Sequence, residues 1–189
     1  LEVSYKKDNG IFYTDIELSR KIIEFLSIPS DTVIMDPCCG TGSFVLAAKE
    51  MGFSSVYGAD IDKKVIELSK KEYGIENLKV IDTLANSGGA ILKQFKLKEP
   101  VDFVIGNPPY APMSTDIVID TTDYLFLRNV KDSGSNLFVA ALYSAFELTK
   151  TKGIISYIIP KNLLHVASYG LLRRTIVNEK KIISIVDIG

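Results

Sequence analysis

Apolar runs separated by charged or glycine-containing stretches recur along the 189-residue chain. Continuous apolar runs predict strands buried on both faces, and apolar positions three and four residues apart, as at Leu18, Ile22 and Phe25, predict amphipathic helices. The predicted strands are 32–35, 55–59, 78–81, 101–106, 154–159 and 182–188, and the predicted helices are 15–27, 43–51, 63–73, 135–150 and 170–179. Strands and helices therefore alternate along the chain.

This alternation predicts an α/β fold, a doubly wound and mostly parallel sheet with helices on both faces. Ligands of such sheets bind at the carboxyl ends of the strands. Polar segments follow each of the first four predicted strands, namely the turn 36–42, Asp60, Asp82 and Asn107. We therefore expect these segments to meet at one edge of the sheet and to form a binding site.

Composition favours one globular domain, because 47% of the residues are hydrophobic and 24% are charged, which excludes a disordered chain. No uncharged apolar stretch is long enough to span a bilayer, and the N-terminus lacks the layout of a signal peptide. We expect a cytoplasmic protein without a membrane partner. Cys38 and Cys39 are adjacent, so we expect neither a disulfide framework nor a metal site, and we interpret both cysteines as small buried hydrophobes.

The charge distribution bears on partners more than the net charge of −1 does. Residues 153–189 carry five Lys or Arg side chains, Arg173 and Arg174 among them, against Glu179 and Asp187. This segment is either a contact surface for nucleic acid or a solvated helix face.

The turn after the first strand has the features of a nucleotide-binding loop. Gly40 and Gly42 allow positive φ and close backbone approach, and Asp60 ends the next strand, where its carboxylate can accept hydrogen bonds from ribose hydroxyls. The loop lacks a third glycine and a phosphate-binding lysine, so an adenosine-type ligand without pyrophosphate fits better than NAD or ATP. Asp82 either accepts from an exocyclic amine or caps a helix.

The tetrapeptide Asn107-Pro108-Pro109-Tyr110 follows the fourth strand. The prolines fix φ and donate no hydrogen bonds, so the backbone carbonyls are presented rigidly. Asn107 adds an amide oxygen and Tyr110 a flat ring. Two acceptors beside a stacking surface suit a planar substrate that carries an –NH₂ group.

Together these motifs resemble those of the gamma-group DNA adenine-N6 methyltransferases of bacterial restriction–modification systems, over nearly the whole chain. The resemblance implies the S-adenosylmethionine-dependent, class I, Rossmann-like methyltransferase fold. It implies a cofactor site of Phe12, Tyr13, Thr14, Asp36, Pro37, Cys38, Gly40, Gly42, Phe44, Asp60, Ile61, Asp82 and Asn107, and catalysis by Asn107, Pro108, Pro109 and Tyr110. Asp15 stands where the family usually has proline.

The implied reaction transfers a methyl group from S-adenosyl-L-methionine to the N6 amino group of an adenine flipped out of double-stranded DNA. Two alternatives remain: a protein glutamine-N5 or RNA methyltransferase with the same turn, and a cofactor-binding subunit that is inactive without a partner segment. A specificity or nuclease segment of a parent protein is a further expected partner.

In the resembled family, a strand like 182–188 is followed by a last strand that inserts into the sheet and then by a target-recognition domain. We therefore expect residues 1–189 to be a single methyltransferase catalytic domain, truncated before the final strand and without the target-recognition domain.

Overall fold

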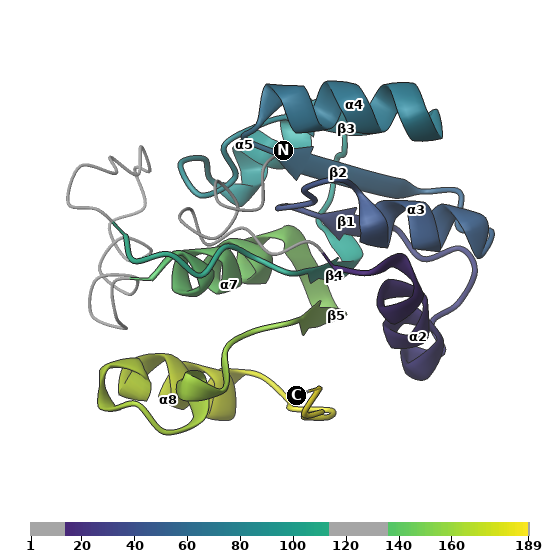
Figure 1. Ribbon diagram of the computed structural model, residues 1–189. Helices are drawn as coiled ribbons and strands as arrows, with labels where there is room; N and C mark the ends of the chain where they lie inside the picture. The colour runs from purple at the N-terminus through teal and green to yellow at the C-terminus, as the bar shows by residue number, and fades with distance from the viewer. Residues whose placement is uncertain (1–13, 114–135, 189) are drawn as a thin grey trace.

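The computed structural model describes residues 14–113 and 136–188 (Figure 1). In this part of the chain, a parallel five-stranded sheet has the order β3-β2-β1-β4-β5. The strands are β1 (Ile34–Asp36), β2 (Val56–Asp60), β3 (Leu78–Val80), β4 (Val101–Gly106) and β5 (Thr149–Tyr157). The predicted parallel α/β architecture is confirmed.

Helices cover both faces of the sheet. They are α2 (Ile16–Leu26), α3 (Ser43–Glu50), α4 (Lys63–Tyr73), α5 (Gly88–Gln94), α7 (Leu137–Leu148) and α8 (Gly170–Glu179), with short 3₁₀ turns η1 (Lys161–Leu164) and η2 (Ala167–Tyr169). Helices α2, α3 and α4 pack with Phe103 and Ile105 of β4, whereas α5 and α7 pack with Val101 and Val104. The largely buried α7 agrees with the predicted apolar helix, and none of the described helices is long and apolar enough to cross a membrane.

Helix α5 was not predicted, because it has only seven residues and begins with Gly88 and Gly89, which are poor helix formers. Strand β5 also begins five residues earlier than the predicted 154–159. The first residues of β5 are polar, so the apolar pattern does not identify them as part of a strand. In the structure one of them, Lys150, forms an ion pair with Asp102 of β4 at 3.0 Å.

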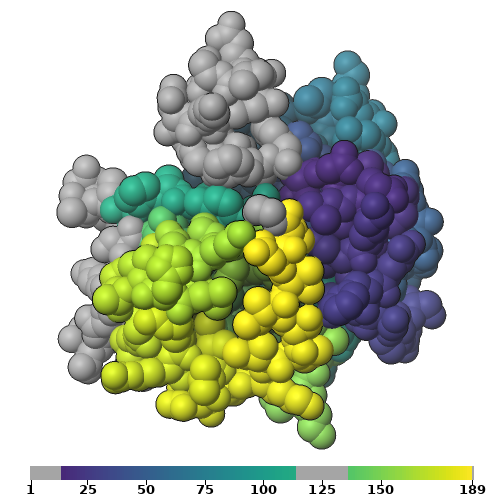
Figure 2. All heavy atoms as spheres, turned by 60° about the horizontal axis from the view of Figure 1, so that its bottom comes forward, coloured from purple at the N-terminus to yellow at the C-terminus, as the bar shows by residue number. Residues whose placement is uncertain are grey.

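The predicted strand 182–188 is wrong. This segment has no strand structure, and its apolar side chains are exposed, with Ile185 at 66%. A strand requires a neighbouring backbone for its hydrogen bonds, and no such partner lies beside residues 182–188 in the part of the chain that the structure describes. The segment runs instead over the surface between α8 and α2 (Figure 2).

Candidate functional site

The four polar segments meet at the carboxyl edge of the sheet, as predicted. Asp36 and Asp60 are the last residues of β1 and β2, Asn107 directly follows β4, and Asp82 lies two residues beyond β3. The parallel pairing places these strand ends side by side. Residues far apart in the sequence thus form one edge, where we place the candidate site.

Asp60 holds the glycine loop in shape. Its Oδ2 accepts a hydrogen bond from the Gly40 amide at 2.8 Å, and its Oδ1 accepts from the Asp62 amide at 2.9 Å. Gly40 and Gly42 have φ of 50° and 84°, the left-handed region that the sequence predicted for them. Burial raises the pKa of Asp60 against the effect of these hydrogen bonds. The sequence pattern suggested a ribose ligand here but did not reveal that Asp60 also shapes the loop.

The groups around this loop suit an adenosine. A carboxylate offers about four lone-pair positions, so Asp60 can accept further hydrogen bonds beside those from the backbone. Ile61 is 67% exposed, an apolar side chain available to an aromatic ring. Helix α3 begins after Gly42 without a side-chain cap. By contrast, the Phe44 side chain is only 3% exposed and packs within the core, and the place of Phe44 in the cofactor site stays a prediction.

The two cysteines are protonated thiols. Burial raises the pKa of Cys38 and of Cys39, and the nearby Asp36 raises both further. The Cys38 Sγ lies 3.7 Å from the Thr83 hydroxyl, which itself donates to the Pro37 carbonyl at 2.7 Å. Because the reactive form of cysteine is the thiolate, these side chains act as packing groups.

Asp36 is buried at the centre of the edge, 2% exposed, and accepts a hydrogen bond from the Cys38 amide at 3.1 Å. A Cβ at Gly106 would lie 2.8 Å from the Asp36 Oδ1. Glycine at this position therefore lets the carboxyl lie against the backbone that leads into Asn107. Burial, with a smaller contribution from the charge of Asp60, raises the pKa of Asp36 from 3.8 to about 8.

This pKa predicts how stability depends on pH. The folded protein holds the Asp36 proton more tightly than the unfolded chain does. The stability that this proton adds is therefore complete below pH 3.8 and is lost as the pH rises to about 8. The free energy of unfolding of the wild type should therefore fall relative to that of Asp36→Asn across this range. Denaturant titrations at several pH values test this, with Asp31→Asn at an exposed position as the control. If the free energies of unfolding of wild type and Asp36→Asn change with pH in parallel, this prediction is wrong.

Asp82 caps a turn. Its Oδ1 accepts from the Leu84 and Ala85 amides, each at 3.1 Å, and its carbonyl accepts from the Asn86 side chain. Asp82 therefore acts as a cap, although of the turn at 83–85 and not of a helix, and its predicted contact with an exocyclic amine stays a prediction.

The Asn107 amide is oriented by its neighbours. Its Nδ2 donates to the Thr14 hydroxyl at 3.2 Å, and its Oδ1 accepts from the Tyr110 hydroxyl. The Tyr110 hydroxyl also lies 2.9 Å from the Ile158 carbonyl, and the Tyr110 carbonyl accepts from the Asn136 side chain at 2.7 Å. Burial raises the pKa of Tyr110 to about 12, so its hydroxyl remains a donor. The parts played by Thr14 and Ile158 here were not predicted from the sequence, because both lie far from the tetrapeptide along the chain.

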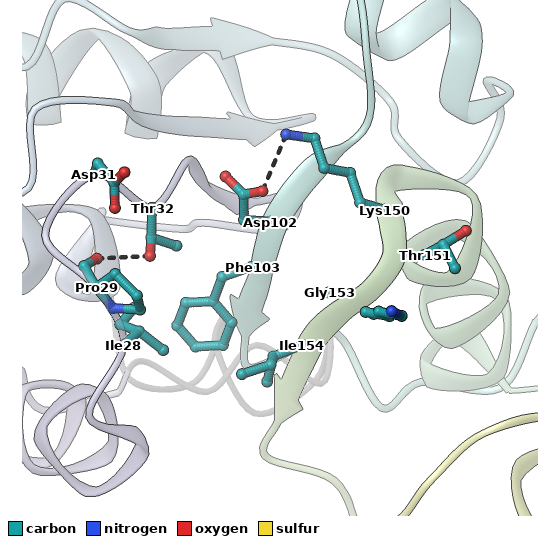
Figure 3. Close-up of a pocket in the computed structure, with 11 residues that line it drawn as sticks. Ile28, Pro29, Asp31, Thr32, Asp102, Phe103, Lys150, Thr151, Gly153 and Ile154 are labelled. Carbon is teal, nitrogen blue, oxygen red and sulfur yellow. Dashed lines mark hydrogen bonds and ion pairs between the residues drawn. The ribbon is translucent and has the colours of Figure 1, made fainter.

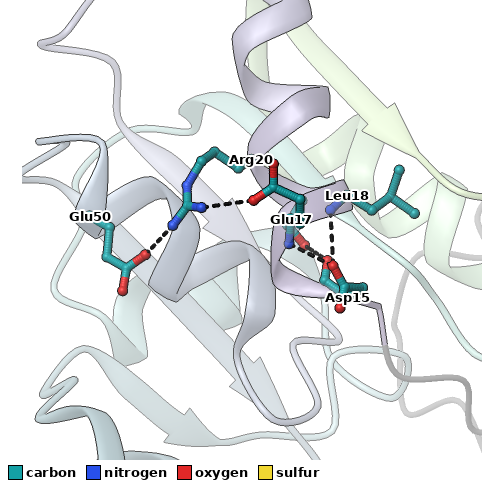
Figure 4. A network of polar contacts seen from close by, with 6 residues as sticks. Asp15, Glu17, Leu18, Arg20 and Glu50 are labelled. Carbon is teal, nitrogen blue, oxygen red and sulfur yellow. Dashed lines mark hydrogen bonds and ion pairs between the residues drawn. The ribbon is translucent and has the colours of Figure 1, made fainter.

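Thr14 directly precedes the N-cap of α2, and Figure 4 shows the polar contacts at the start of this helix. Asp15 is the N-cap of this helix and accepts from the Glu17 amide at 2.8 Å and the Leu18 amide at 3.4 Å. Arg20 then joins α2 to Glu50 of α3 through an ion pair. The aspartate at position 15, where the resembled family usually has proline, thus caps the helix. The other predicted residues of this motif, Phe12 and Tyr13, lie outside the described residues.

Two other features lie away from this edge. Arg173 donates to the Leu163 and Val166 carbonyls, so its guanidinium supports the turns after β5. A contact of this basic segment with nucleic acid stays a prediction. The pocket in Figure 3 lies at the opposite end of β4 and β5. There Asp102 accepts from the Val33 amide and from Lys150, which together lower the pKa of Asp102. No cluster of potential metal ligands occurs among residues 14–113 and 136–188.

Comparison with known proteins identifies clear relatives. The model of the family described as N-6 DNA Methylase matches residues 3–189. Type II methyltransferase M.VspI of Vibrio sp. (strain 343) is 26% identical over 193 residues, which cover 100% of this chain and 46% of that protein. Modification methylase CviBIII of Paramecium bursaria Chlorella virus NC1A is 28% identical over 179 residues, covering 91% of this chain and 43% of that protein. The chain thus spans less than half the length of these curated relatives.

A solved structure shares the fold. The type I restriction-modification system methyltransferase subunit from Streptococcus thermophilus matches with a TM-score of 0.65 at 22% identity, covering 89% of this chain and 39% of that chain. This likeness confirms the predicted fold class.

Proposed function

Since this chain belongs to the N-6 DNA methylase family, we propose that it transfers a methyl group from S-adenosylmethionine to the N6 amino group of an adenine in double-stranded DNA. One observation carries the proposal. Thr14 accepts from the Asn107 Nδ2, which leaves the amide oxygen as an acceptor, at the same sheet edge as the Asp60 loop. An amine acceptor site and an adenosine-type site are thereby adjacent.

The chain's own groups fit the cofactor. Asp60 would accept from the ribose hydroxyls, Ile61 would lie against the adenine ring, and Gly40 and Gly42 permit close backbone approach. Asp82 would accept from the adenine amino group. When bound, S-adenosylmethionine supplies a methyl group activated by a sulfonium.

Asn107 and Pro108 would prepare the target amine. The lone pair of an aromatic amine is delocalised into the ring, so this nitrogen is a poor nucleophile. Hydrogen bonds accepted by the Asn107 amide oxygen and the Pro108 carbonyl favour a pyramidal nitrogen and localise that lone pair. Pro109 stiffens the turn, and the Tyr110 ring would stack on the flipped adenine. Catalysis in this scheme is mainly positioning and dipole stabilisation.

The relatives are about twice as long as this chain. We therefore include in the proposal that residues 1–189 form a catalytic domain, and that recognition of the DNA sequence belongs to a partner segment. The domain on its own should bind DNA weakly and without choice of sequence.

A transfer assay with radiolabelled methyl donor tests the function. Duplex DNA, transfer RNA and a glutamine-containing peptide are offered separately, and the labelled product is hydrolysed and identified. Recovery of N6-methyladenine from the DNA is the expected result. If the labelled methyl group is found only in RNA or only in the peptide, the substrate is that alternative and not adenine in DNA. Cofactor binding without transfer to any of them would favour a binding subunit that depends on a partner.

A further inference from the structure

The Thr83 hydroxyl joins two parts of the candidate site that lie far apart in the sequence. Thr83 follows Asp82 in the turn after β3, and its hydroxyl donates to the Pro37 carbonyl at 2.7 Å. Pro37 belongs to the glycine loop between β1 and α3, which the Asp60 carboxylate holds further along, at the Gly40 amide. The bond from Thr83 therefore ties the beginning of this loop to the segment that carries Asp82.

Thr83 is itself held from the opposite side. Its side chain is only 3% exposed, and its carbonyl accepts a hydrogen bond at 3.3 Å from the hydroxyl of Ser144, a buried residue of α7. The Cys38 Sγ lies 3.7 Å from the Thr83 hydroxyl, but a thiol is only a weak hydrogen-bonding group. Because the bond between Thr83 and Pro37 is buried, loss of the hydroxyl would leave a desolvated carbonyl without this donor.

We infer that Thr83 is a positioning residue of the cofactor site, whose hydroxyl sets the place of Asp82 relative to the glycine loop. This inference rests on the proposed function, in which the Asp82 carboxylate accepts from the adenine amino group. The Leu84 and Ala85 amides orient that carboxylate within its own turn, but they do not join the turn to the loop. The bond from Thr83 to Pro37 does so. Recognition of the amino group should therefore depend on the Thr83 hydroxyl.

The test compares two ligands that differ only in the amino group. S-adenosylhomocysteine and its purine analogue, in which hydrogen replaces the adenine amino group, are titrated calorimetrically into wild type, Thr83→Val and Thr83→Ser. The wild type should bind S-adenosylhomocysteine about tenfold more tightly than the analogue, the effect of one hydrogen bond to a carboxylate. Thr83→Val should bind S-adenosylhomocysteine about three- to tenfold more weakly than the wild type and the analogue almost equally well. Thr83→Ser retains the hydroxyl and should keep the wild-type ratio of affinities.

Thr32→Val is the matched control. The Thr32 hydroxyl also donates to a proline carbonyl, that of Pro29 at 2.6 Å, but in the segment before β1, away from the candidate site (Figure 3). This variant should change neither affinity. Ser144→Ala removes the support of Thr83 from α7 and should give the same selective loss to a smaller degree, so it decides the inference if Thr83→Val does not fold.

Other outcomes separate the inference from the proposed function. If Thr83→Val weakens both ligands equally, or neither, the hydroxyl does not place Asp82 and the inference is wrong, while the proposed cofactor stands. Unchanged discrimination in Ser144→Ala counts against the inference in the same way. If the folded wild type binds neither ligand, the proposed cofactor site fails, and the inference fails with it.

Discussion

Methyl transfer to DNA should fall by at least about a hundredfold when Asn107 is replaced by alanine, with affinity for S-adenosylmethionine within about threefold of the wild type. The loss is large because the variant removes a preorganised acceptor from the nitrogen whose reactivity it controls. Cofactor affinity should change little, because the loop that would hold the ribose is shaped by Asp60 and Gly40, whose hydrogen bond does not involve Asn107.

The measurement pairs single-turnover transfer of a radiolabelled methyl group with calorimetric titration of the cofactor. Asn77→Ala is the control, because Asn77 lies just before β3 at the opposite edge of the sheet. It should retain wild-type transfer. A parallel loss of transfer and of cofactor affinity in Asn107→Ala would contradict the role assigned to Asn107, as that pattern indicates a residue that only supports the cofactor site.

Replacing Asp60 by alanine should weaken S-adenosylmethionine binding at least about tenfold, from a dissociation constant on the order of micromolar in the wild type. Two losses combine in this variant. The Gly40 and Asp62 amides lose their acceptors, which frees the loop to change shape, and the ribose hydroxyls lose a charged acceptor. Asp60→Asn should also bind weakly, because an amide NH₂ would face one of the two backbone N–H donors.

Asp62→Ala separates this effect from a general effect on stability. Asp62 lies two residues away and accepts from the Lys64 and Val65 amides as the N-cap of α4. Its loss should lower stability by about 1 kcal/mol and leave cofactor affinity unchanged. Calorimetric titration of all four proteins is the measurement. Wild-type affinity in Asp60→Ala, or an equal weakening in Asp62→Ala, would remove Asp60 from the proposed cofactor site.

Several predictions from sequence were correct because they depend on local chemistry. Continuous apolar runs such as 101–106 identify strands buried on both faces, and glycines such as Gly40 and Gly42 identify turns with positive φ. Once the strands are parallel, the residue after each strand must lie at one edge. The sequence alone therefore places Asp36, Asp60 and Asn107 together.

Other predictions failed where the outcome depends on distant neighbours. The apolar residues 182–188 carry the pattern of a strand but lack a strand partner in the described part of the chain, since pairing is not a property of one segment. Helix α5 is too short for its apolar pattern to identify it as a helix from the sequence alone.

By itself the sequence determined the order of β1 to β5 and of the longer helices, the parallel sheet and the set of residues at its carboxyl edge, because apolar period and turn chemistry are encoded within a few neighbouring residues. Only the tertiary structure decided how these residues contact one another. The hydrogen bond from Asn107 to Thr14 joins positions 93 residues apart, and that between Tyr110 and Ile158 joins positions 48 apart. Such contacts depend on the packing of whole strands and helices, and they orient the one amide on which the proposed chemistry depends.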